Sequence, residues 1–93
     1  MHSITMFLDE EGRIKQLPAK AGKRRAVLAY LATKFSFDND YTEKEVNAII
    51  DHWHTFGDYF VLRRELIDYQ FLGRTRDGVR YWKEKSAENI DFA

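Results

Sequence analysis

Hydrophobic side chains recur every three or four positions in three segments of the chain, which is the spacing of one buried helix face. The segments are residues 20–35, 43–54 and 59–69, and each of them predicts a helix. The positions expected to be buried are Val27, Leu28, Leu31 and Phe35 in the first helix, Val46, Ile49, Ile50 and Trp53 in the second, and Tyr59, Leu62, Leu66 and Tyr69 in the third.

Capping signals mark the starts of the two later helices. Thr42 followed by Glu45 is a capping box, in which each side chain accepts a hydrogen bond from the other residue's backbone N–H. Asp58 is a good N-cap for the third helix, and Gly57 just before it suits a left-handed backbone at a tight corner. We therefore expect a short turn between the second and third helices.

After Gln70 the hydrophobic spacing becomes that of strands, and the dipeptide Asp77-Gly78 predicts a two-residue hairpin with a type I′ turn. The expected register pairs Arg76 with Val79, Thr75 with Arg80, Arg74 with Tyr81 and Gly73 with Trp82. A tryptophan ring can cover the bare backbone of a glycine across the ladder, which would stabilise this register.

The order of these elements predicts an α+β fold that resembles a winged helix-turn-helix, with three helices, a C-terminal β-hairpin wing and a short N-terminal hairpin or arm. In the arm, Gly12 would supply a turn and Pro18 would end the segment. We expect one domain over residues 1–93, with the arm at 1–18, the helical core and wing at 19–85, and a loosely held tail at 86–93.

The composition is typical of a small packed domain and indicates no particular function. The 93 residues are 44% hydrophobic and contain no cysteine, so thiolate metal sites and disulfides are excluded. The start has no secretory signal pattern, and no apolar run is long enough to span a membrane, so we expect a soluble, cytoplasmic protein without membrane contact. The net charge is zero, but two basic segments flank an acidic one, so local faces matter more than the total.

The stretch DHWHTFGDY, residues 51–59, raises the question of a metal or catalytic cluster. His52 and His54 lie about 200° apart on a helix, and His2 is the one other histidine, so we expect neither a metal site nor a cofactor. We expect Trp53 and Phe56 to belong to the core and the two histidines to be partly exposed. Catalytic residues are not expected, because no nucleophile–base set or phosphate loop is present. A small metal-dependent or acid–base enzyme is therefore the least favoured of three hypotheses, after nucleic-acid binding and protein–protein interaction.

A winged helix that reads DNA lays its third helix in the major groove and its wing along the phosphates. Arg64, on the outward face of the third helix, would then face the bases. The residues expected to neutralise phosphates are Lys20, Lys23, Arg24, Arg74, Arg76 and Arg80. For the three arginines of the hairpin wing, a role in keeping the protein soluble is an equally good explanation. Arg63 is expected to be structural, paired with an acid of the second helix, and Glu65 to pair within its own helix.

Other features favour a protein contact. The second helix is acidic, the net charge is zero, and the outward face of the third helix carries Phe60, Val61 and Asp68 without asparagine or glutamine. The pair Phe60 and Val61 suits a homodimer or another regulator's domain. The leading hypothesis is a noncatalytic module that contacts nucleic acid through the third helix and wing; the alternative is a protein–protein interaction or dimerisation module without DNA binding.

The segments LPAKAGKRRAVLAYLATKF, YTEKEVNAII and LRRELIDYQFLGRTRDGVRYW resemble an uncharacterised bacterial family, the domain of unknown function 2087. That family occurs as a stand-alone small protein and as the C-terminal part of bacterial transcriptional regulators that carry a separate helix-turn-helix. The resemblance implies a context of transcription regulation. It implies no activity, ligand or site residue, because the family has none established.

Overall fold

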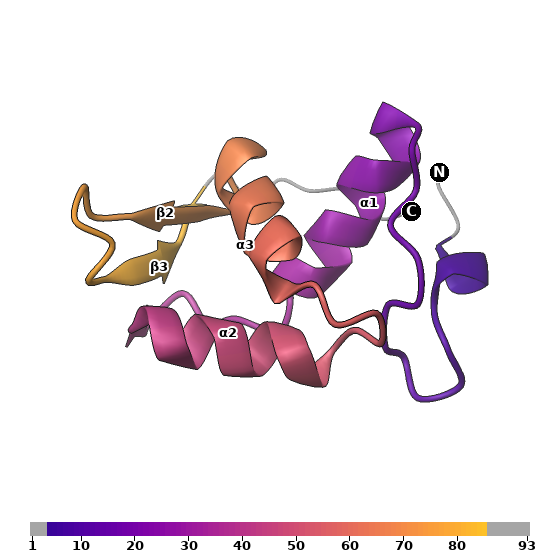
Figure 1. Ribbon diagram of the computed structural model, residues 1–93. Coiled ribbons are helices and arrows are strands. Elements are labelled where there is room, and N and C mark those ends of the chain that lie inside the picture. Colours follow the sequence, from indigo (N-terminus) through magenta and orange to yellow (C-terminus); the bar gives the residue numbers. More distant parts are fainter. Residues whose placement is uncertain (1–3, 86–93) are drawn as a thin grey trace.

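The computed structural model describes residues 4–85, in which three α-helices and a three-stranded antiparallel sheet form an α+β fold (Figure 1). The predicted tail at 86–93 lies outside the described residues. The elements are a 3-10 helix at Thr5–Phe7, α1 at Ala21–Ala32, β1 at Asp40–Tyr41, α2 at Glu43–His52, α3 at Tyr59–Asp68, β2 at Leu72–Arg74 and β3 at Tyr81–Lys83.

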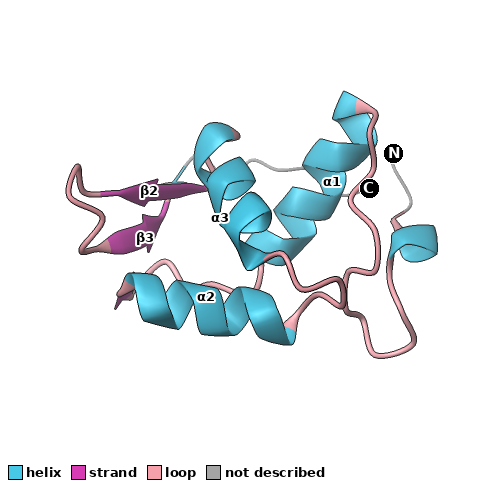
Figure 2. Ribbon diagram, viewed as in Figure 1, coloured by secondary structure: helices cyan, strands magenta, loops and turns pink. Residues whose placement is uncertain are grey.

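The helical core lies between α1, α2 and α3, with α3 in the middle of the molecule (Figure 2). Most of the predicted core positions are buried, and Val27, Ile50, Leu62 and Leu66 have no exposed surface. The prediction was wrong for Tyr59, the first residue of α3, which is 38% exposed.

Both predicted helix caps are confirmed. The Thr42 N–H donates to Glu45 Oε1 at 2.8 Å, and the Glu45 N–H donates to Thr42 Oγ1 at 3.1 Å. Asp58 Oδ1 accepts from the Val61 N–H at 3.3 Å, so this side chain starts α3 as expected. The C-terminal ends lie earlier than the patterns indicated, at Ala32 for α1 and His52 for α2.

The sheet has the order β1-β3-β2, so the last of the three described strands is the central one. The predicted register is confirmed where Gly73 lies opposite Trp82 and Arg74 opposite Tyr81. The two-residue β1 was not predicted, because the sequence there resembles a turn.

The predicted type I′ turn was wrong. That turn needs a positive φ at both central residues, and here Gly78 has φ 74° while Asp77 does not have a positive φ. The Gly78 N–H instead donates to the Thr75 carbonyl at 3.0 Å, which closes a turn one residue earlier. Residues 76–79 therefore form a longer loop in which Arg76 and Val79 are not paired strand residues.

The N-terminal arm is a hairpin-like segment, as predicted, with Gly12 in the left-handed region at φ 80° and Leu8 bridged to Ile14. Its docking site was not predicted. The fully buried Ile14 donates its N–H to the Trp53 carbonyl at 2.7 Å and accepts from the Thr55 N–H at 2.9 Å. The arm therefore packs beside the end of α2 (Figure 1).

This docking overturns two predictions for the stretch DHWHTFGDY. His54 is buried at 5% exposure, whereas Phe56 is 39% exposed, so their expected environments are exchanged. The reason is that α2 ends at His52, after which the chain pairs with Ile14 and the helical spacing no longer decides which side chains face inward. His54 Nδ1 lies 2.6 Å from the Ile50 carbonyl, and Nε2 accepts from the Asp58 N–H at 2.9 Å.

Within residues 4–85, no helix is both long enough and apolar enough to cross a membrane.

Candidate nucleic-acid interface

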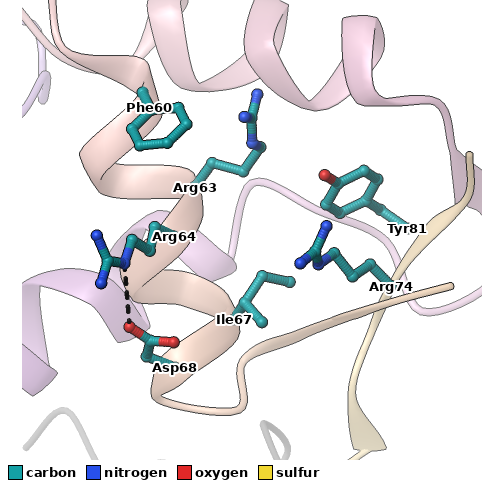
Figure 3. A pocket seen from close by; sticks show the side chains of 7 residues that line it. All are labelled: Phe60, Arg63, Arg64, Ile67, Asp68, Arg74 and Tyr81. Atoms are coloured by element: carbon teal, nitrogen blue, oxygen red, sulfur yellow. Dashed lines mark ion pairs between the residues drawn. The ribbon is translucent and has the colours of Figure 1, made fainter. Parts of the chain in front are cut away.

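A groove with a volume of about 250 Å³ lies between the outward face of α3 and the β2–β3 hairpin (Figure 3). It brings together two of the residues expected to contact nucleic acid, Arg64 and Arg74, with one residue of the expected protein interface, Phe60. The residues that line it are Phe60, Arg63, Arg64, Ile67, Asp68, Arg74 and Tyr81. We call this feature the α3–hairpin groove.

Arg63 forms the wall of the groove nearest α2. Its guanidinium donates to Asn47 Oδ1 at 2.5 Å and lies 3.5 Å from Glu43 Oε1, which confirms the predicted pairing with an acid of the second helix. The same guanidinium lies over the Phe60 ring, 5.3 Å from its centroid. The Arg63 side chain is 14% exposed and its charge is paired with Glu43, so it forms part of the groove wall and contributes less accessible charge than Arg64 or Arg74.

Tyr81 ties the hairpin to the same point. The ring is buried, and its hydroxyl donates to Glu43 Oε1 at 3.2 Å. Glu43 therefore joins Arg63 of α3 to Tyr81 of the central strand, and the two walls of the groove are fixed relative to each other.

Arg74 and Arg64 carry the more accessible positive charge of the groove. Arg74 extends from β2 across the groove alongside Tyr81 (Figure 3), and its guanidinium has no hydrogen bond or ion pair with any residue in the described part of the chain. Arg64 lies 3.9 Å from Asp68 with both side chains mostly exposed, a pairing worth little in water. Both guanidiniums are therefore available to an anionic partner.

Arg24 does not belong to an accessible surface. Its Nε donates to Glu65 Oε1 at 2.8 Å and its Nη1 donates to the Pro18 carbonyl at 3.0 Å. The expectation that Glu65 pairs within α3 was therefore wrong, because its partner comes from α1. Arg24 links α1 to α3 through this ion pair, and we exclude it from the candidate interface.

The remaining basic residues of the expected interface lie in different places. Lys20 and Lys23 lie at the start of α1, which is at the end of the molecule opposite the hairpin (Figure 1). Arg76 is exposed on the hairpin loop, and Arg80 lies 3.5 Å from Asp40 with both side chains more than half exposed. The residues do not form one continuous patch, and those on the hairpin are the ones near the groove.

Two shifted pKa values describe the hairpin itself. The hydroxyl of Thr75, which donates to Asp77 Oδ1 at 2.7 Å, is the main cause that lowers the pKa of Asp77, and the Val79 N–H adds to it. Burial lowers the pKa of Lys83, whose ammonium donates to the Phe35 carbonyl at 3.3 Å. The loop is thus held by an ionised carboxylate.

Neither His52 nor His54, the two histidines that the structure describes, lines the groove. His52 is exposed, and both ring nitrogens of His54 are used by backbone partners. Among residues 4–85 there is no group of three or more histidine, cysteine or acidic side chains that could hold a metal ion.

Sequence reasoning missed Ile67 and Tyr81 as groove residues and placed Val61 beside Phe60, although Val61 does not line the groove. A usable signal was present, because Phe60, Arg64 and Ile67 follow one another at helical spacing on α3. The position of Tyr81 in the groove depends on the pairing of β1 with β3, and no local sequence pattern predicts that pairing.

Comparison with known proteins gives one match. The family described as "Uncharacterized protein conserved in bacteria (DUF2087)" matches residues 13–83, which include the whole of the groove. No curated protein and no solved structure matches the chain.

Proposed function

We propose that this chain, which belongs to the uncharacterised bacterial family DUF2087, is a noncatalytic winged-helix-like module of transcription regulation that contacts nucleic acid through α3 and the hairpin. The element order helix, strand, two helices and two strands, with the first strand paired to the last, supports this interpretation because it matches the layout expected of a winged helix. The resemblance to domains found in bacterial regulators supports the regulatory context.

The observation that carries the proposal is the α3–hairpin groove. It gathers Arg63, Arg64 and Arg74 around one opening, on the two elements that a winged helix presents to nucleic acid. Arg76 on the loop extends the positive charge toward the tip of the hairpin. Phosphates supply most of the affinity of such modules, and arginine binds them in a bidentate manner.

The acidic residues limit how a nucleic acid could lie. Glu43 flanks the groove on the side of α2, so the proposed contact uses the outward face of α3 and the hairpin rather than the start of α2. We therefore assign phosphate contact to Arg64, Arg74 and Arg76.

The test is binding to pooled genomic fragments, offered both as duplex and after heat denaturation, over a range of salt. We expect binding that weakens steeply with salt, and a weaker, less salt-dependent complex for Arg74→Gln, because each lost phosphate contact lowers the slope of log K against log salt by about 0.7–0.9. Lys15→Gln, an exposed substitution on the arm away from the hairpin, is the matched control and should behave as the unaltered chain. Absence of binding to both forms at low salt would refute the proposal.

A second candidate function, protein–protein contact, is supported by the exposure of Phe60, which at 56% leaves much of a large apolar ring in water. Light scattering tests it directly for self-association. A dimer that Phe60→Glu makes monomeric would assign this surface to a second copy of the chain, whereas a monomer at high concentration would remove homodimerisation.

A further inference from the structure

The outward face of α3 is unusual for a helix that reads base edges in a duplex. Its exposed side chains are Tyr59, Phe60, Arg64 and Asp68, and none of them is an asparagine or glutamine. Two of the four are aromatic. Aromatic rings stack on the flat faces of bases, which a duplex hides and a single strand exposes.

Phe60 already has one cation–π contact. The guanidinium of Arg63 lies 5.3 Å from the centroid of its ring and is itself held by Asn47 and Glu43, so the ring packs against a positioned cation. The ring is nevertheless 56% exposed and lines the groove. A preorganised exposed ring loses little conformational freedom when a partner stacks on it.

The size of the groove limits what can enter. Pockets for drug-sized ligands have volumes of about 300–1,000 Å³, whereas this one has about 250 Å³. It suits a single flat ring with an attached anionic group better than a larger ligand. The unpartnered guanidinium of Arg74 on the opposite wall, in the part of the chain that the structure describes, supplies the matching positive charge.

Neighbouring acids disfavour a second strand. Glu43, which contacts both Arg63 and Tyr81, lies beside the groove with its side chain half exposed, and Asp40 lies on β1, the strand that precedes α2. The phosphates of a second strand that crossed toward α2 would approach these carboxylates, whereas one strand can follow Arg64 and Arg74, with Asp68 as the one acid among the residues that line the groove.

We propose that the preferred ligand is single-stranded nucleic acid, with one base stacked on Phe60 and the adjoining phosphate bound by Arg74. This inference rests on the proposed function, of which it names the substrate class. It requires that the chain bind a strand more tightly than the same strand in a duplex.

The experiment uses fluorescence anisotropy with the full chain and a labelled mixed-sequence DNA strand of about 16 nucleotides, the upper end of known site sizes for one small domain. The strand is offered alone and annealed to its complement. Phe60→Leu keeps an apolar side chain and removes the π face; Phe37→Leu makes the same change at another exposed phenylalanine that does not line the groove. Circular dichroism of each variant checks that the fold is retained.

We expect the single strand to bind at least about fivefold more tightly than the duplex, and Phe60→Leu to weaken single-strand binding by about five- to tenfold, as the loss of one stacked base would. Phe37→Leu should leave it unchanged. Equal or tighter binding of the duplex, or an equal effect of the two leucine variants, overturns the inference and leaves the proposed function standing. Binding of neither form refutes both.

Discussion

The burial of His54 predicts a large loss of stability when its imidazole is removed. The side chain joins the last turn of α2 to the start of α3, because Nδ1 bonds to the Ile50 carbonyl and Nε2 accepts from the Asp58 N–H. Since the Ile50 carbonyl can only accept, Nδ1 carries the proton and Nε2 is free to accept. One ring therefore fixes the corner between the two helices.

The magnitude follows from these contacts. Each hydrogen bond contributes about 1 kcal/mol net, and loss of the ring leaves a cavity beside Phe56, whose ring centroid is 4.8 Å away. The Ile50 carbonyl keeps a second bond from the Trp53 N–H, so the Asp58 N–H is the group left without its partner. We expect His54→Ala to lower the free energy of unfolding by about 2–4 kcal/mol.

Urea and thermal unfolding measure this change. For a chain of 93 residues, a loss of about 3 kcal/mol corresponds to a fall in Tm of roughly 12–24 °C. His54→Phe keeps the ring and removes both hydrogen bonds, so it should cost about half as much. His52→Ala, at the exposed neighbouring histidine, is the control and should stay within about 0.5 kcal/mol. If His54→Ala lowered the free energy of unfolding no more than His52→Ala does, the conclusion that His54 stabilises the corner between α2 and α3 would be wrong.

Three further changes test other parts of the fold. In Gly73→Ala the new Cβ would lie 2.5 Å from Trp82 Nε1, so the indole must move and urea unfolding should show a loss of about 1–3 kcal/mol with altered tryptophan fluorescence; an unchanged midpoint would contradict the close packing. A double-mutant cycle of Arg24→Ala and Glu65→Gln should give a coupling energy of about 1–2 kcal/mol, because both side chains are at least three-quarters buried, and a value near zero would show that the ion pair is not formed. The carboxylate of Asp77 has a lowered pKa, so its contribution to hairpin stability is present above the ordinary value of 3.8 and is lost as pH falls through the lowered one; NMR titration of the carboxyl should show a midpoint below 3.8, and a midpoint at or above it would contradict the bond from the threonine hydroxyl.

Local signals predicted the parts of the fold that depend on near neighbours. The capping box at Thr42 and the cap at Asp58 each join residues three positions apart, so the sequence alone contains both partners. The register that places Gly73 beside Trp82 follows in the same way from the position of the turn, even though the turn type was different.

Contacts between distant residues were the ones that sequence reasoning missed. Ile14 reaches His54 across 40 positions, and Arg24 reaches Glu65 across 41, so neither pairing leaves a periodic trace. The first of these contacts exchanged the environments of His54 and Phe56, which lie outside the α3–hairpin groove. The second occupies Arg24, which had been expected to bind phosphate.

The strand order β1-β3-β2 has a consequence for synthesis on the ribosome. Of the three described strands, the central one, Tyr81–Lys83, is made last, and both outer strands depend on it for their pairing. Until that segment has left the exit tunnel, Asp40–Tyr41 and Leu72–Arg74 have no neighbour, and Tyr81 cannot yet bridge to Glu43. The groove is thus assembled in one late step, and nascent chains halted before residue 81 should lack it entirely.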